Sequence, residues 1–276
     1  MHDGLPLILD RDAELAAVSD ASRGAAGGDG SVVLVTGPDG IGKTALMRAA
    51  RAGTGTAVRV LTARGMALEQ DFSFGIVRQL FEPVRAAVGP GGWDELLDGG
   101  SDPHAATHGL YWLTANLAAR QQLLIMVDDA HWADAPSLRW LSHLAARIED
   151  LPVVLMVAAR SGPDLPEVID ELPDLPSCTV LALRPLSAEA TATLVRAHLS
   201  PASDDAPAPD DTRETSEEPD DEFCAACHGA TGGNPFLLQA LLVALREARD
   251  TTVPLTPAMV TAAGPRPVAT AAARRV

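Results

Sequence analysis

The sequence is short of basic residues, of cysteines and of long apolar stretches. It holds 37 acidic residues against 21 lysines and arginines, a formal net charge of -16. This argues against a nucleic-acid surface, because phosphate backbones are bound by Lys and Arg patches. Its three cysteines, an odd and small number, suit reduced thiols in a cytoplasm better than a disulfide framework. The longest apolar run, near residues 151–159, is broken by Pro152 and is too short to span a bilayer.

The N-terminal stretch also lacks the features of a secretory signal. Its first residues, MHDGLPLILDRDAEL, carry acids where such a signal has a basic start and a long apolar centre. We therefore expect a cytoplasmic protein without membrane association. With 276 residues and 47% hydrophobic content, the chain can bury a sizeable core, as one large domain or as a main domain with a smaller one.

Short β-branched and aliphatic runs alternate with amphipathic stretches, which is typical of a parallel sheet covered by helices on both faces. Five runs predict strands, at residues 31–36, 57–63, 123–129, 152–159 and 178–183. Helices are expected between them, at residues 43–52, 74–88, 104–120 and 135–148. The pattern predicts an α/β domain over residues 1–185, with a five-stranded parallel sheet flanked by helices.

The pattern changes after residue 183, where strand signals stop and helical signals begin. One helix is expected within residues 187–199, and two more on either side of TGGNP, where Pro235 suits the first helical position. We therefore predict a small helical lid subdomain over residues 186–265, and residues 266–276 would begin a truncated C-terminal region.

One segment of this second region is unusually acidic. Residues 200–222 hold ten acids against one arginine and almost no large apolar side chains. Such a segment cannot offset its own ordering entropy, so we predict a disordered insertion there. The alternative, a docking segment for a basic partner, is the less common use of such runs.

A phosphate-binding loop is the clearest motif in the chain. Gly37, Gly42, Lys43 and Thr44 match G-x-x-x-x-G-K-[ST], after a predicted buried strand and before a predicted helix. Lys43 would reach the β- and γ-phosphates, and Thr44 would offer a hydroxyl to Mg²⁺. Asp39 is unfavourable beside a phosphate, although a side chain at that position can point to solvent. The predicted nucleotide contacts in the loop are Gly37, Pro38, Asp39, Gly40, Ile41, Gly42, Lys43, Thr44 and Ala45.

A P-loop needs a second anchor for the metal ion, at the carboxyl end of another strand. The stretch LLIMVDDAHWAD provides it. Asp128 is expected to hold Mg²⁺ through water, with Thr44 as the other metal ligand, and Asp129 to orient or activate the attacking water. Alone, two acids at a strand end would indicate a solvated turn, but beside a P-loop they favour a catalytic pair.

The fourth predicted strand ends in VAARSGP, which places Arg160 at the same edge of the sheet. A cation there could reach a γ-phosphate. We therefore predict a catalytic role for Arg160 with Lys43 and Asp129, although an arginine after a strand is commonly a surface residue.

The stretch CAACH, at residues 224–228, matches the pattern for covalent haem attachment. Haem attachment belongs to exported proteins and needs an axial partner in an apolar pocket, whereas no export signal is found here. Cys224, Cys227 and His228 fall at helical spacing, so burial of two small thiols against a core is the simpler interpretation.

Together these motifs resemble the nucleotide-binding domain of the signal-transduction ATPases with numerous domains (STAND), within the AAA-type P-loop group. In particular, the chain resembles the ATPase part of large ATP-binding LuxR-family transcriptional regulators from actinobacteria. The resemblance covers most of residues 5–265 and is carried by GPDGIGKTAL, DFSFGIVRQLFEP, LLIMVDDAHWADAPSLRWLSHLAARI, VVLMVAARSGP and ATGGNPFLLQALL.

The resemblance implies an ASCE-type P-loop NTPase fold and an ATP/ADP switch with Mg²⁺. The ADP form would be resting and the ATP form open to self-association. Pro235 would touch the adenine, and the segment that starts at Arg11 would pack near the base. The family usually has a glycine before that arginine, where this chain has Asp10. No winged helix, repeat sensor or helix-turn-helix follows residue 265, so direct DNA binding is not expected.

Three functions are open at this point. The first is a slowly hydrolysing ATP switch domain of a LuxR-family regulator. The second is a nucleotide-holding module without turnover, because the lid is split by the acidic insertion and a partner-supplied arginine is absent. The third, a small-molecule kinase, would need an acceptor pocket and mobile lid arginines, where the chain offers acids and prolines after its fourth predicted strand.

Overall fold

The computed structural model describes residues 8–85, 97, 103–163, 165–199, 219–248 and 256–263. The described residues up to Leu183, apart from Gly40–Gly42, form one compact unit. Gly40–Gly42 and the described residues from Arg184 onward form a second unit.

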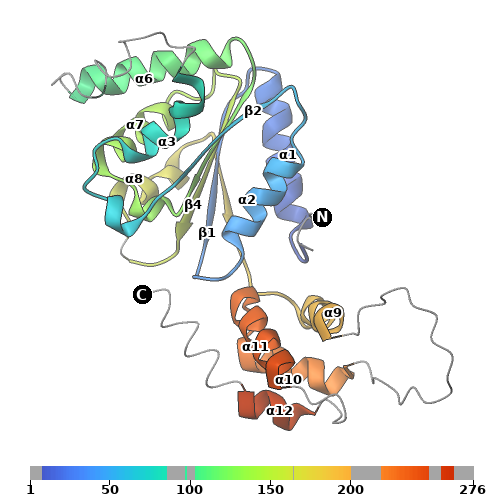
Figure 1. Cartoon of the computed structure of the whole chain (residues 1–276). Helices are drawn as coiled ribbons and strands as arrows, with labels where there is room; N and C mark the ends of the chain where they lie inside the picture. The colour runs from blue at the N-terminus through green and yellow to red at the C-terminus, as the bar shows by residue number, and fades with distance from the viewer. Residues whose placement is uncertain are drawn as a thin grey trace. The chain divides into compact units, whose positions relative to one another are not determined.

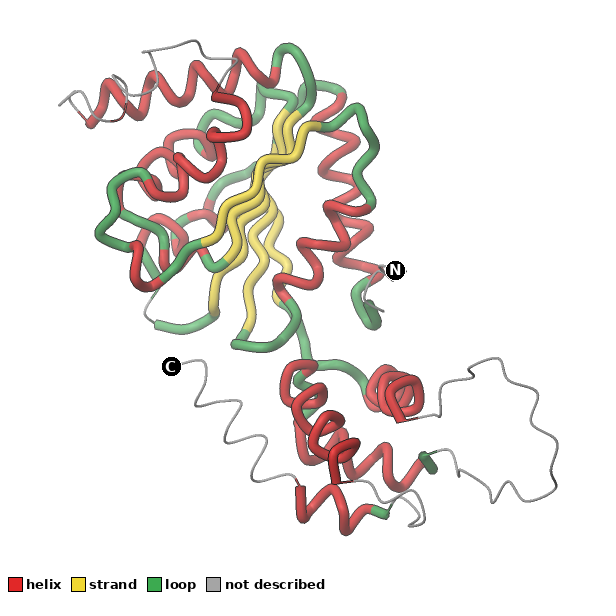
Figure 2. The backbone as a smooth tube through the Cα atoms, in the orientation of Figure 1, coloured by secondary structure: helices red, strands yellow, loops and turns green. Residues whose placement is uncertain are grey.

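The first unit is built on a five-stranded parallel sheet (Figure 2). Its strands are β1 (Ser31–Gly37), β2 (Arg59–Arg64), β3 (Leu123–Asp128), β4 (Val153–Arg160) and β5 (Cys178–Ala182). They lie in the order β2-β3-β4-β1-β5, and every neighbouring pair is parallel. The five predicted strands are confirmed, each end within two residues of its predicted position.

Burial along the strands follows their places in the sheet. Every residue of β3 is buried, and so is every residue of β4 except Arg160. Central parallel strands are covered on both faces, which is why these two read as uninterrupted apolar runs. The edge strand β2 instead alternates, with Leu61 and Ala63 buried and Thr62 and Arg64 exposed.

Helices cover both faces of this sheet (Figure 1). One face carries α1 (Asp12–Ala26) and α2 (Lys43–Ala52). The other carries α3 (Gly75–Phe81), α6 (Pro103–Ala118), α7 (Ala135–Ala145) and the short α8 (Glu167–Asp170). The largest buried side chain, Trp140, lies under this second layer and meets Phe81 edge to face, with ring centroids 5.5 Å apart.

Three of the four helices predicted in this domain are confirmed, and the one predicted over residues 74–88 is shorter than expected. Helix α3 ends at Phe81 and a 3₁₀ turn, η2 (Glu82–Val84), follows. Pro83 explains the change, because it has no backbone N–H to continue the helical ladder. Residues 86–88 lie outside the described residues. The other 3₁₀ turns are η1 (Ala67–Glu69), η3 (Ala130–Trp132) and η4 (Leu172–Asp174).

Asp134 joins two helices of the second layer. Its side chain is only 2% exposed and caps α7 by accepting a hydrogen bond from the Ser137 N–H at 2.9 Å. It also accepts from the N–H groups of Phe74 at 2.8 Å and Ile76 at 3.3 Å, at the start of α3. A single buried carboxylate therefore ties the first turns of α3 and α7 together.

The second unit is helical. It contains α9 (Ala188–Leu199), α10 (Asp221–Thr231), α11 (Pro235–Ala248) and α12 (Pro257–Ala263). The three predicted helices are confirmed, and Pro235 is the first residue of α11 as expected. Side chains cap two of them, since Ser187 accepts from the Ala190 N–H at 3.0 Å and Asp220 from the Phe223 N–H at 2.7 Å.

The predicted insertion over residues 200–222 ends too late at its C-terminal side. Asp220 is the N-cap of α10, and Asp221 and Glu222 form its first turn, where carboxylates favour the positive end of the helix dipole. The rest of the predicted insertion, residues 200–218, lies outside the described residues, as do residues 266–276.

The cysteines of the CAACH stretch are buried in α10, which confirms the structural interpretation. Burial raises the pKa of the Cys224 thiol and raises that of Cys227 to about 12. The His228 Nδ1 lies 3.0 Å from the Thr191 hydroxyl, so it is engaged within the helical unit. Among the described helices, none has the length and apolar character needed to cross a membrane.

Candidate nucleotide-binding site

The predicted phosphate-binding loop connects the end of β1 to the start of α2. Gly40 and Gly42 have φ angles of 77° and 104°, which residues with a side chain rarely adopt. A Cβ at Gly42 would meet nothing within 4 Å, so backbone conformation alone explains the second glycine of the motif. The loop leads into the N-terminus of α2, where the helix dipole and unsatisfied N–H groups favour an anion.

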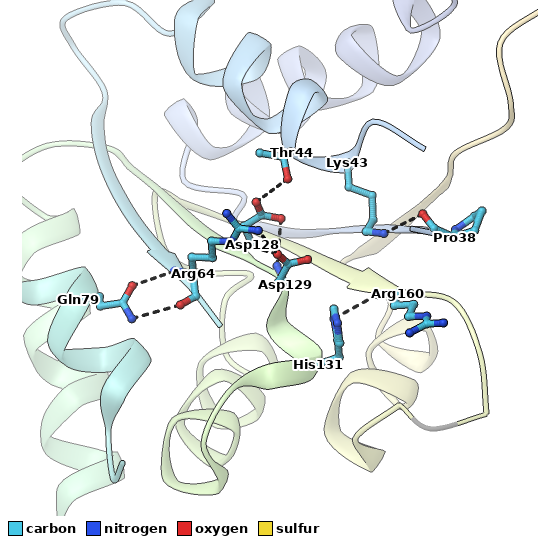
Figure 3. Close-up of polar contacts among 9 residues, drawn as sticks. All are labelled: Pro38, Lys43, Thr44, Arg64, Gln79, Asp128, Asp129, His131 and Arg160. Carbon is cyan, nitrogen blue, oxygen red and sulfur yellow. Dashed lines mark hydrogen bonds and ion pairs between the residues drawn. The ribbon is translucent and has the colours of Figure 1, made fainter. Parts of the chain in front are cut away.

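Lys43 is 6% exposed and lies against the loop (Figure 3). Its ammonium group donates to the carbonyl of Gly37 at 2.8 Å and to that of Pro38 at 3.1 Å. A phosphate in the loop would have to draw the ammonium away from one or both carbonyls. The lysine is therefore positioned beside the predicted phosphate site, held by neutral acceptors that a charged oxygen can replace.

Thr44 and Asp128 meet across the sheet edge. The Thr44 hydroxyl donates to the Asp128 Oδ2 at 2.7 Å, at the end of β3. Mg²⁺ prefers oxygen ligands, and it usually takes one or two from the protein and the rest from phosphates and water. The described residues hold no cluster of three or more His, Cys, Asp or Glu side chains for a metal. A hydroxyl and a carboxylate of this kind fit a magnesium ion that is carried by a nucleotide.

Asp129, predicted to act on water, lies in an unusual backbone conformation. Its φ and ψ of 48° and 41° are left-handed, a region that aspartate tolerates better than most residues. Its carboxylate accepts hydrogen bonds from Arg64, from Nη2 at 2.8 Å and from Nε at 3.0 Å. The hydrogen bond to Asp129 is the main reason that the pKa of Arg64 is raised. The predicted base is therefore bound to an arginine.

Arg64 was not among the residues predicted for the site. Its position is explained by the strand beside it, β3. It is the last residue of β2 and pairs in register with Asp128 of β3. Gln79 of α3 fixes its backbone, accepting from the Arg64 N–H at 2.9 Å and donating to its carbonyl at 3.2 Å. Figure 3 shows Arg64 and Gln79 on one side of Asp128, with Lys43 and Arg160 on the other.

Arg160 lies at the predicted sheet edge, because it pairs in register with Gly37 of β1. Its guanidinium forms an ion pair with Asp39 of the loop, with 3.4 Å between Nη1 and Oδ2. Asp39 therefore has a cationic partner, where the sequence suggested only that it could point to solvent. The Arg160 N–H also points to the Nδ1 of His131 at 3.4 Å. Burial lowers the pKa of His131.

The two residues predicted to lie near the adenine belong to different units. Arg11 is 5% exposed and precedes α1, and its Nη1 donates to the carbonyl of Asp10 at 2.7 Å. Asp10 has a φ of 55°, so an aspartate adopts the left-handed turn for which glycine is the usual residue. Pro235 begins α11 in the second unit. The adenine contacts of both residues stay predictions.

Comparison with known proteins identifies the family of this chain. A model of the AAA ATPase domain matches residues 8–157, more than half of the chain. The chain belongs to this family. The match spans the P-loop, Asp128 at the end of β3, Asp129 directly after it and most of β4, and it ends before Arg160. It therefore covers most of the candidate site of this AAA ATPase domain.

Other similarities are more distant. An uncharacterized protein of Rhizobium meliloti (strain 1021) is 28% identical in an alignment of 230 positions that covers 70% of this chain and 22% of that protein. A STAND protein with a tetratricopeptide repeat sensor from Pyrococcus horikoshii has a TM-score of 0.51 and 21% identity, covering 90% of this chain and 31% of its own. The AAA ATPase chain thus spans about a fifth of the length of the Rhizobium meliloti protein and about a third of that of the Pyrococcus horikoshii protein.

The Orc1 protein of Aeropyrum pernix, solved in complex with DNA, has a TM-score of 0.55 and 17% identity, covering 95% of this chain and 67% of its own. The RuvB branch migration motor of Thermotoga maritima has a TM-score of 0.50 and 15% identity, covering 94% of this chain and 71% of its own. At these identities the likeness shows the fold. The five-stranded P-loop NTPase fold is therefore confirmed, and the family match confirms the coarser prediction of an AAA-type ATPase domain.

Proposed function

We propose that this AAA ATPase domain is a nucleotide switch that binds ATP and ADP with Mg²⁺, hydrolyses ATP slowly, and belongs to a LuxR-family transcriptional regulator of the STAND type. The observation that supports the nucleotide site best is the convergence of Lys43, Thr44, Asp128 and Asp129. They come from the start of α2 and the end of β3, with 2.7 Å between the Thr44 hydroxyl and the Asp128 carboxylate.

Each of these side chains has a role that its position supports. Lys43 would donate to the β- and γ-phosphates, and Thr44 and Asp128 would hold Mg²⁺ directly and through water. When bound, the ion would neutralise charge that develops on the transferred phosphoryl group. Asp129 would orient the attacking water and accept its proton.

Arg160 would act as a reporter of the γ-phosphate. At present its partner is Asp39, and both side chains are well exposed, at 58% and 41%. Exposed ion pairs of this kind contribute about 0–1 kcal/mol, so a phosphate group could replace Asp39 at little cost. That exchange would distinguish the ATP form from the ADP form and would accompany self-association of the ATP form.

The experiment that tests turnover compares the wild-type chain with Asp129→Asn at saturating Mg·ATP. Removing a general base should lower the rate by at least about a hundredfold, while Mg·ATP binding persists because Lys43, Thr44 and Asp128 are intact. Asp20→Asn, an equivalent change at an exposed position on α1, is the matched control and should leave the rate unchanged. Equal, near-zero rates in wild type and Asp129→Asn would contradict a hydrolysing switch.

One observation favours the second candidate, a module that holds nucleotide without turnover. The two hydrogen bonds from Arg64 to Asp129, at 2.8 and 3.0 Å, both occupy the Oδ2 of the predicted base. If this restraint sets the rate, Arg64→Ala should raise turnover. An inactive wild type whose turnover rises in Arg64→Ala would support a holder restrained by Arg64, whereas an inactive wild type with no increase would show that this restraint is not the cause.

The proposal that the domain belongs to a LuxR-family regulator is tested on the coding sequence next to that of this chain. We expect the coding sequence that follows residue 276 in the same reading frame to contain a helix-turn-helix. Its absence would remove the LuxR part of the proposal without affecting the nucleotide site.

A further inference from the structure

A cavity of about 270 Å³ lies on the Arg64 side of Asp128. Figure 3 places Lys43, Pro38 and Arg160 on the opposite side of the same carboxylate. The cavity reaches Thr44 and Asp128 at one end, and otherwise its lining comes from α2, β2, β3 and α3. It is therefore separate from the loop where the phosphate chain of a nucleotide would bind, and only the metal ligands border both.

The layout of the sheet explains why this space exists. Helix α2 packs on β1, β3 and β4, whereas β2 is the edge strand beyond β3. On β2, Leu61 and Ala63 are buried while Thr62 and Arg64 are exposed. The cavity lies between the exposed side of this edge strand and α2.

Three arginines are among the residues that line the cavity, Arg48, Arg51 and Arg64. Arg48 and Arg51 are one turn apart on α2, so they share a face of that helix. Within the described part of the chain, neither forms an ion pair, although the sequence has 37 acids against 21 basic residues. The position of Arg51 in the last turn of α2 suits the helix dipole, but that does not account for Arg48, and Arg64 is already paired with Asp129.

The remaining lining indicates what kind of anion would fit. Met47 and Met126 are buried apolar residues of the wall, and Gln79 adds a polar group. Arginines recognise phosphate and carboxylate oxygens through paired N–H groups. Drug-sized ligands occupy pockets of about 300–1,000 Å³, so a cavity of about 270 Å³ has room for an oxyanion with a short apolar body.

We propose that this cavity binds a small organic oxyanion, with its charged group on Arg48, Arg51 and Arg64 and its apolar body against Met47 and Met126. The oxyanion replaces Asp129 as the partner of Arg64 and leaves Asp129 available to a water molecule. This regulatory step rests on the proposed function, whereas binding in the cavity does not.

The binding step is tested by titration calorimetry on the full chain with phenylphosphate, after the P-loop has been saturated with Mg·ADP. We expect uptake at one site. The Arg48→Ala/Arg51→Ala double variant should bind at least about tenfold more weakly, the effect of losing a charge-assisted hydrogen bond. Arg139→Ala, an exposed arginine on α7, is the matched control and should bind as the wild type does.

Two chemical controls separate the parts of the ligand. Benzyl alcohol keeps the ring without the charge, and inorganic phosphate keeps the charge without the ring, so both should bind more weakly than phenylphosphate. No uptake of phenylphosphate, or equal uptake by the double variant, would overturn the site. If Mg·ADP itself is not taken up, the proposed function fails, while uptake that depends on Arg48 and Arg51 still supports the cavity.

The regulatory step is tested by ATP turnover with saturating phenylphosphate. We expect a rise of about two- to fivefold, the range that corresponds to losing one solvent-exposed ion pair. The double variant should keep the basal rate of the wild type and show no rise. Binding without any change in rate would overturn the exchange at Arg64.

Discussion

Replacing Asp134 should destabilise the sheet unit far more than replacing one of its surface acids. This carboxylate is 2% exposed and accepts hydrogen bonds from three N–H groups, of Phe74, Ile76 and Ser137. In Asp134→Ala, two short hydrogen bonds and one longer one are lost, and the amides stay buried. Each buried amide left without a partner costs about 1–3 kcal/mol, so the loss of all three partners should lower the free energy of unfolding by at least about 3 kcal/mol.

A conservative variant separates the charge from the hydrogen bonds. Asp134→Asn retains one oxygen, which can still accept from Phe74 and Ser137, as the Asp134 Oδ1 does now. Its amide nitrogen would face the Ile76 N–H, now 3.3 Å from the Oδ2, as donor against donor. We expect a smaller loss for this variant, about 1–2 kcal/mol.

The assay is urea unfolding of the full chain followed by tryptophan fluorescence. Trp140 is fully buried in α7, the helix that Asp134 caps, so it reports on the relevant layer. Asp20→Ala removes the same charge from a side chain that is 65% exposed and should change stability by no more than about 0.5 kcal/mol. If Asp134→Ala unfolded at the same urea concentration as Asp20→Ala, its role in joining α3 and α7 would be refuted.

Two further predictions concern Gly65 beside Asp129 and two histidines of the sheet unit, His131 in η3 and His143 in α7. A Cβ at Gly65 would lie 2.3 Å from the carbonyl oxygen of Asp129, so Gly65→Ala should displace that residue and lower ATP turnover without lowering the affinity for Mg·ADP; unchanged turnover would contradict the role of Asp129. Burial lowers the pKa of His131 and His143, so the unfolded chain binds more protons. The free energy of unfolding should therefore fall as the pH drops through their ordinary pKa of about 6.5, and a His131→Gln/His143→Gln variant should show a weaker dependence in urea titrations.

The strands and most helices could be predicted because their signals are local. The buried strands β3 and β4 appear as continuous apolar runs, and the P-loop and Asp128 follow from motif spacing. The predicted C-terminal end of α3 was wrong because of Pro83. A proline is tolerated in the first turn of a helix, but further along it interrupts the backbone hydrogen bonds.

The contacts between the residues of the candidate site could not be predicted in the same way. The pairing of Arg64 with Asp129 depends on β2 lying beside β3. The pattern of apolar residues predicts where strands form, but it does not predict their order in the sheet. The same holds for Asp39 with Arg160, where the register of β1 and β4 brings loop and strand end together. Asp134 and Phe74 are 60 positions apart, and nothing in the local pattern relates them.

The account depends most directly on whether the loop and its lysine hold a nucleotide's phosphates. Titration calorimetry of the folded wild-type chain with Mg·ATP should register one molecule taken up per chain. Lys43→Ala, with its fold verified by circular dichroism, should register little or none. A wild-type chain that is folded and takes up no Mg·ATP, or a Lys43→Ala variant that binds it equally well, would contradict the proposed site.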